Sequence, residues 1–181
     1  EIISALFGYG QFSESSVLNS AKALYFFSLG LPAFAMIKVF SNFFFANHDT
    51  KTPFYISFIS VILNILISVY FFKSIGFIII PIATTISSWF NLIILYLFLQ
   101  KKDLFNFNNI FIGRFLKIVF SSVLMGLFFN YLILLFSDQL SFENSLKSIY
   151  LILSVVLGLG FYLLVSYLIK AFQLEDIKLK Y

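Results

Sequence analysis

Four long runs of this chain contain no charged side chain. They are Phe54–Phe72, Ser74–Gln100, Ile118–Ser137 and Ser148–Ile169, and a fifth, about Ala23–Asn47, is interrupted only by Lys38. About 20 apolar residues in a helix cross the hydrocarbon core of a bilayer. The strands of a membrane β-barrel would be shorter and would alternate apolar with polar residues. In lipid, the backbone N–H and C=O groups of such a run must be hydrogen-bonded within the protein, which a helix achieves within each segment. The sequence therefore predicts an all-α integral membrane protein with five transmembrane helices.

Composition supports this class and excludes others. The chain is 61% hydrophobic and only 11% charged, whereas soluble domains carry about 25% charged residues. The net charge of +4 is not gathered on a basic face, so nucleic acid is not an expected partner. The chain has no cysteine, which excludes disulfides and thiolate metal sites. No catalytic motif is present, so neither an enzyme nor a cofactor is expected.

Basic residues in the connections predict the orientation, because cytoplasmic loops carry the excess of Lys and Arg. One side receives Lys51, Lys101, Lys102, Arg114, Lys117, Lys170, Lys178 and Lys180, and the other receives Lys22, Lys73 and Lys147. The cytoplasm is therefore expected to face residues 48–53, an interfacial loop at 101–117 and the tail at 171–181. Residues 1–22 are expected outside, and a turn at 73–76 faces the same way. Because the chain begins at Glu1 without a signal-peptide pattern, we expect a C-terminal fragment.

The stretch NHDTKTP, residues 47–53, predicts a tight turn between the first two spans. Pro53 suits the first residue of a helix because the N–H it lacks is unpaired there anyway. Asp49 can cap the same helix through its carboxylate. The turn is completed by Thr50, Lys51 and Thr52. Its tightness leads to the hypothesis that the two flanking helices move together.

Two kinds of residue interrupt the apolar spans. Lys38 lies about 13 Å of helix rise before the cytoplasmic end, where a cation normally faces a cavity or a partner. The alternative is a lysine whose ammonium reaches back to the interface. Pro32 and Pro81 each remove a helix hydrogen bond, and Gly30 loosens the turn beside Pro32. Such breaks line the path of some transporters, but proline also occurs in ordinary spans.

Small polar residues form a seam in the second and third spans: Asn64, Ser68, Thr84, Thr85, Ser87 and Ser88. Asn64 and Ser68 are four residues apart and share a helix face, and the spacing recurs at 84 and 88. Residues of this kind often join helices. Their oxygens could instead hold a hard cation, although the seam contains no carboxylate. In the last two spans, small pairs at 122/126 and 154/158 predict close packing.

Two stretches resemble one known family. LFGYGQFSESSV, residues 6–17, and GLPAFAMIKVFSNFFFANHDTKTP, residues 30–53, resemble the C-terminal half of the MurJ/MviN lipid II flippases. That family shows an LF-x-x-G-x-F stretch, a span ending in K-V-L/F and an F-Y/F-A-x-x-D-T-K-T-P turn. The matching residues are Lys38, Val39, Phe45, Ala46, Asp49, Thr50, Lys51, Thr52 and Pro53. The resemblance is specific over about residues 1–100.

The resemblance implies a fold of the MOP exporter superfamily, with two six-helix lobes around a central cavity and two further helices. Residues 23–100 would supply spans ten to twelve, and residues 118–170 would supply spans thirteen and fourteen, which line a lipid groove. The missing N-terminal lobe would be the partner of this segment. The implied activity is transfer of lipid II, an undecaprenyl-pyrophosphate-linked peptidoglycan precursor, to the periplasmic leaflet of the bacterial inner membrane by alternating access.

The resemblance also assigns site residues. Lys38 becomes the candidate for the substrate path. Some relatives couple transport to sodium through Asn, Asp, Thr and a backbone carbonyl. Asn64, Thr84 and the Ile80 carbonyl match that spacing, but Ser68 stands where the pattern has Asp. Sodium binding is thus implied without its charged ligand.

Two other functions remain open at this point. One is another MOP exporter, for polysaccharide units or drugs, which basic residues of the N-terminal lobe would distinguish. The other is a membrane scaffold for cell-wall enzymes, which has no need of a hydrated Lys38 at mid-depth.

Overall fold

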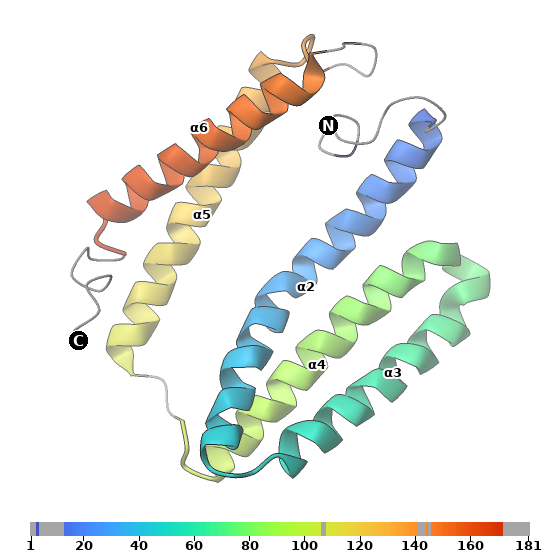
Figure 1. Cartoon of the computed structure of the whole chain (residues 1–181), viewed down its shortest axis with the longest axis vertical. Coiled ribbons are helices and arrows are strands. Elements are labelled where there is room, and N and C mark those ends of the chain that lie inside the picture. The colour runs from blue at the N-terminus through green and yellow to red at the C-terminus, as the bar shows by residue number, and fades with distance from the viewer. Residues whose placement is uncertain (1–2, 4–12, 106–107, 141–143, 145, 172–181) are drawn as a thin grey trace. The chain divides into compact units, whose positions relative to one another are not determined.

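The computed structural model describes residues 3, 13–105, 108–140, 144 and 146–171. The long helices within those ranges are α2 (Glu14–Ala46), α3 (Lys51–Ile75), α4 (Ile79–Lys101), α5 (Asn109–Leu135) and α6 (Lys147–Leu168), and the short 3-10 helix η1 (Gly76–Ile78) joins α3 to α4 (Figure 1). No strand occurs in the described parts, which confirms the all-α fold class. The expected features at residues 1–2, 4–12 and 172–181 lie outside the described residues.

Four continuous helical stretches of the described chain are long and apolar enough to cross a membrane. The second of them, Lys51–Lys101, contains 51 residues and would be about 77 Å long if it were straight. It folds back at η1 instead, and α3 and α4 lie against each other (Figure 1). This stretch therefore supplies two helices, each long enough to cross the bilayer once.

The reversal between α3 and α4 depends on Gly76. Its φ of 74° lies in the left-handed region, which glycine adopts without the steric cost of a side chain. The Gly76 N–H donates to the Phe72 carbonyl and closes α3. Because α4 begins only at Ile79, Pro81 lies in its first turn, where a missing N–H costs nothing. The prediction that Pro81 breaks a helix is therefore wrong.

Helix α2 continues without interruption through Gly30 and Pro32, over 33 residues. The predicted break at these positions is not found. A Cβ atom on Gly30 would lie 3.1 Å from Thr85 Oγ1 and 3.1 Å from the Phe34 ring. Gly30 therefore allows α4 to approach α2 closely, as small residues do between membrane helices.

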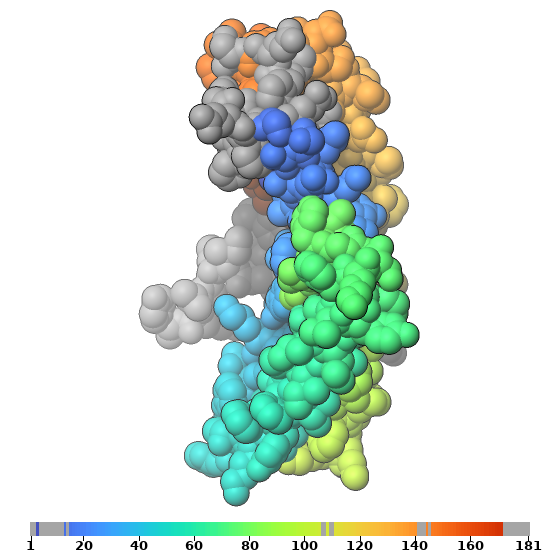
Figure 2. Space-filling model, turned by 90° about the vertical axis from the view of Figure 1, so that its right-hand side faces the viewer, coloured from blue at the N-terminus to red at the C-terminus, as the bar shows by residue number. Residues whose placement is uncertain are grey.

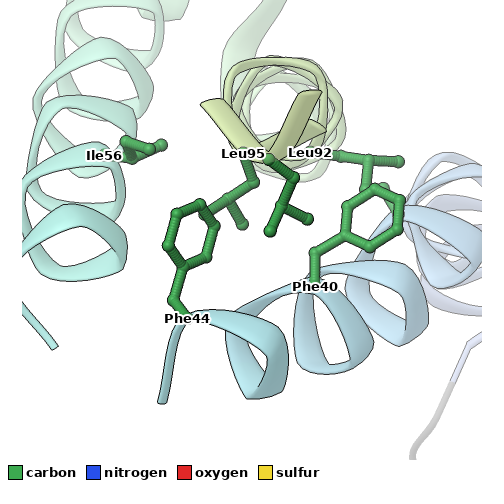
Figure 3. Close-up of a cluster of buried hydrophobic side chains, with 7 residues drawn as sticks. Phe40, Phe44, Ile56, Leu92 and Leu95 are labelled. Carbon is green, nitrogen blue, oxygen red and sulfur yellow. The ribbon is translucent and has the colours of Figure 1, made fainter. Parts of the chain in front are cut away.

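The core of α2, α3 and α4 is a cluster of side chains at helical spacing. It consists of Ala33, Phe40, Phe44, Ile56, Leu92, Leu95 and Leu99. Phe40 and Phe44 point from α2 toward Leu92 and Leu95 of α4 (Figure 3). Lipid tails are as apolar as these side chains, so close van der Waals packing stabilises the cluster rather than removal of apolar surface from water.

The outward side of α3 is uncovered (Figure 2). Its large apolar side chains with more than half of their surface exposed include Phe54, Tyr55, Phe58, Leu66 and Tyr70. Contiguous apolar surface of this extent marks a membrane or protein contact. It fits a helix whose outer face meets lipid.

Helices α5 and α6 pack against each other as a separate pair. The Phe128 and Phe161 rings stack with centroids 4.4 Å apart. Ser154 is fully buried, and a Cβ on Gly158 would lie 3.4 Å from the Phe129 ring. The small pair of α6 thus lies at the contact between the two helices, as predicted.

The small pair predicted on α5 does not lie at this contact. Ser122 is exposed, and a Cβ on Gly126 would meet nothing within 4 Å. Ser121 is fully buried instead. One residue corresponds to about 100° of rotation around a helix, so this shift in register turns the pair away from α6.

The interfacial loop predicted at 101–117 is also shorter than expected. Helix α5 begins at Asn109, so Arg114 and Lys117 lie on its first turns. The interleaved apolar and polar residues of this stretch are compatible with a helix whose backbone is paired internally as it enters the membrane.

Replacing Leu95 with Ala should destabilise the α2–α3–α4 core, because Leu95 is fully buried. Truncating a buried leucine to alanine usually lowers the free energy of unfolding by about 2–5 kcal/mol. Leu97→Ala is the matched control, since Leu97 is on the same helix with 51% of its surface exposed. Thermal unfolding in detergent measures both, and an equal effect of the two changes would contradict this packing.

Candidate polar seam and charged rim

Asn64 lies at the centre of the polar seam and joins α3 to α4. Its Nδ2 donates to Thr84 Oγ1 at 3.1 Å and to Ser87 Oγ at 3.2 Å. Ser68 Oγ donates to Asn64 Oδ1 at 3.4 Å. Thr84 Oγ1 donates in turn to the Ile80 carbonyl at 2.8 Å. The structure thus brings Asn64, Ser68, Ile80 and Thr84, which the sequence singled out, into one hydrogen-bonded network.

A groove of about 480 Å³ extends the seam between α2, α3 and α4. Its polar lining consists of Ser57, Ser60, Asn64, Thr84, Ser87, Ser88 and Asn91, with apolar residues including Phe34 and Ile37 from α2. Asn91 Nδ2 donates to Ser57 Oγ at 3.3 Å, so a second pair joins α3 to α4. Sequence analysis missed Ser57, Ser60 and Asn91. Positions 57 and 91 each lie seven residues from a seam residue, and this spacing on one helix face could have identified them.

The seam residues do not fit a sodium site of the kind that the resemblance implies. Their amide and hydroxyl groups are already paired with one another. None of them carries negative charge, whereas hard cations favour carboxylate oxygens. Within the described ranges, no cluster of three His, Cys, Asp or Glu side chains could hold a metal ion. The observed contacts join helices, which is the other interpretation of the seam.

Thr85 and Trp89 attach α4 to the backbone of α2. Thr85 Oγ1 donates to the Phe26 carbonyl at 2.6 Å, and Trp89 Nε1 donates to the Leu29 carbonyl at 3.0 Å. Because Pro32 has no N–H, the Ser28 carbonyl lacks its usual partner, and the two acceptors lie two residues before it and one residue after it. Side chains from a neighbouring helix commonly supply such bonds in membranes.

Lys38 is exposed on α2, and the described residues provide no ion-pair partner for it. It lies four residues after Phe34, which lines the groove, so the two share one side of the helix. An ammonium at this depth requires water or a polar partner rather than lipid. None of the described helices covers the Lys38 side chain on this face of α2.

Asp49 links three helix ends at the charged rim, which consists of Phe44, Asp49, Thr52 and Lys102. Its Oδ1 accepts from the Thr52 N–H at 3.0 Å, and its Oδ2 accepts from Thr52 Oγ1 at 2.7 Å. The Asp49 carboxylate thus pairs an N–H in the first turn of α3, as predicted, although Thr50 holds the N-cap position and α3 begins at Lys51, two residues before the predicted start. Oδ2 also accepts from Lys102 Nζ, just after α4, at 2.5 Å. That ammonium lies 5.8 Å from the ring centroid of Phe44, on α2.

The same contacts change the protonation of Asp49. The hydrogen bond from Lys102, followed by those from Thr52, holds the pKa of the Asp49 carboxyl well below its usual range. A carboxylate whose pKa falls on folding stabilises the folded state above its ordinary pKa of about 3.9. That contribution is lost as the pH falls below this value.

Comparison with known proteins places the sequence of this chain in a family. The family model described as lipid II flippase MurJ matches residues 1–151, which include every described helix up to the start of α6. The chain belongs to the MurJ family. The match extends past residue 100, where the specific sequence resemblance ended.

Two relatives align with almost the whole chain. The probable lipid II flippase MurJ of Rickettsia prowazekii is 29% identical over 180 residues, which cover 97% of this chain and 35% of the relative. The protein with the same description from Thermotoga maritima is 32% identical over 176 residues, covering 97% and 34%. A Rhizobium meliloti MurJ relative is 38% identical over 95 residues. The chain spans about a third of the length of the first two relatives.

Replacing Asp49 with Ala should lower the free energy of unfolding by about 1 kcal/mol, the usual effect of losing a helix cap. We expect the difference from the unmodified protein to stay constant between about pH 8 and 5 and to shrink below about pH 4, where the Asp49 carboxylate takes up a proton in the unfolded chain but remains ionised in the folded protein. Thermal unfolding across this range measures it.

Lys102→Gln should also destabilise the protein, whereas Lys101→Gln, at the adjacent position outside the ion pair, should not. A pH-independent effect of Asp49→Ala, or equal effects of the two lysine changes, would contradict the role of the charged rim.

Proposed function

We propose that this chain is part of a flippase that carries lipid II from the cytoplasmic to the periplasmic leaflet of the bacterial inner membrane. The observation that carries the proposal is the MurJ family match over residues 1–151. The relatives named above are described as probable lipid II flippases. This match favours lipid II over the cargo of other MOP exporters.

The geometry supports transport by alternating access, in which one lobe moves against the other. Such motion requires helices that behave as one body. The charged rim joins the ends of α2, α3 and α4 at one side of the membrane. The Asn64 network joins α3 to α4 within the span, and Thr85 and Trp89 join α4 to α2. Coupling thus extends beyond the two helices next to the NHDTKTP turn to a third.

Lys38 supplies the positive charge that a pyrophosphate head group would meet on this body. The described helices do not cover its side chain. An exposed cation within a span is more stable in hydrated surroundings than in lipid. We place this side of α2 toward the substrate path. In a scaffold, the same side would instead be covered by protein or lipid.

A cell depleted of its own lipid II flippase provides the direct test. The complete protein that contains this chain should restore growth and outward exposure of lipid II, measured with a probe that cannot cross the membrane. Restored growth without lipid II exposure would contradict the proposed cargo.

Water access to Lys38 can be measured by cysteine labelling, because this chain has no cysteine of its own. Lys38→Cys should react with a membrane-impermeant thiol reagent in intact vesicles. Val39→Cys is the matched control at nearly the same depth, about 100° around the helix, and should react at least tenfold more slowly. Protection of position 38 from both sides of the membrane would favour the scaffold.

A further inference from the structure

Lys73 is the only charged residue between Lys51 and Lys101. It lies in the last turn of α3. In the described part of the chain, no carboxylate forms an ion pair with it. An ammonium at the end of a membrane span needs hydrogen-bond acceptors or water in place of lipid.

A pocket of about 330 Å³ between the end of α3 and the start of α4 supplies such acceptors. Lys73 borders it together with Ser68, Val69, Phe72 and Ile80. Two of these residues, Ser68 and Ile80, also belong to the Asn64 network. The lysine and one end of the polar seam therefore share one pocket.

The hydrogen bonds of the seam leave acceptors toward this pocket. The hydroxyl hydrogen of Ser68 is donated to Asn64 Oδ1, so Ser68 Oγ retains only lone pairs. The Ile80 carbonyl accepts one hydrogen bond from Thr84, and a carbonyl oxygen can accept two. Neither oxygen has a hydrogen left to donate, and both suit a cation or another hydrogen-bond donor.

Two features of α3 orient and stabilise an ammonium here. Long side chains on a helix lean toward its N-terminus and cover the preceding turn, which for Lys73 is the turn that contains Val69. The C-terminal carbonyls of a helix also carry the negative end of its dipole, which favours a cation in the last turn.

We propose that the Lys73 ammonium is the cation bound by this end of the seam, held by Ser68 Oγ and the Ile80 carbonyl. The ammonium, which is part of the α3 chain, thus takes the place of a free metal cation. A sodium ion there would lie beside a fixed like charge, and none of the residues that line the pocket carries a carboxylate to offset the repulsion. The seam of this protein therefore does not take up sodium. This inference concerns cation binding alone and does not depend on the transported lipid.

The binding of radioactive sodium to the purified complete protein, measured in detergent and choline buffer, tests the proposal. The unmodified protein should show no saturable binding that depends on Ser68 or Lys73. Ser68→Asp alone should show little gain, because the new carboxylate is neutralised by Lys73. Ser68→Asp combined with Lys73→Gln should bind sodium at least tenfold more tightly than Ser68→Asp alone, since the carboxylate is then free.

Ser68→Asp with Lys73→Arg is the matched control, because it keeps the positive charge and should not gain binding. Size-exclusion chromatography checks that each variant is folded, and Lys73→Met replaces Lys73→Gln if the first pair is not. Equal sodium affinity in the single and double variants would overturn the proposal, because Lys73 would then be directed to the interface. A folded double variant without sodium binding would overturn it as well.

Discussion

Lipid offers no hydrogen-bond partner to the backbone, and the rest of this structure depends on that constraint. Each long helix pairs its own N–H and C=O groups, and most hydroxyls within the spans follow the same rule. Ser60, Ser122 and Ser154 each donate to the carbonyl four residues earlier. Their hydrogens are thereby satisfied within one helix. What remains for contacts between helices is shape, together with a few polar groups placed where two helices meet.

The contacts between α2, α3 and α4 illustrate how few such groups are used. Within the bilayer, shape complementarity at Gly30 and the Phe40–Phe44 cluster is combined with amide and hydroxyl bonds centred on Asn64. At the charged rim, where water is near, a full ion pair is used instead. Among the contacts that join these three helices, the ion pair thus lies where desolvation of charge is small, and neutral hydrogen bonds act where desolvation would be large.

Lys38 and Lys73 are the exceptions that carry functional information. The described residues give neither of them a carboxylate partner, and both lie in or at the end of a membrane span. Placing an unpaired charge in or beside the hydrocarbon core costs free energy, and such a charge normally meets water, substrate or a set of hydrogen-bond acceptors. For Lys38 the open side of α2 favours a hydrated path. For Lys73 the shared pocket with Ser68 and Ile80 favours the seam itself.

The sequence by itself determined the fold class and the identity of the spans, because the length of an uncharged run and the internal pairing of its backbone are local properties. It also determined the Asp49 cap, which acts within four residues, and it found the members of the Asn64 network by helical spacing. Only the structure decided that Gly30 packs against α4 rather than breaking α2, that Pro81 lies in the first turn of a helix, and that Ser121 rather than Ser122 is buried. The place of Pro81 depends on where the turn at Gly76 ends, whereas the packing of Gly30 and the burial of Ser121 depend on the register of one helix against another. That register is set by the summed van der Waals fit of many side chains, which no spacing within a single helix reports.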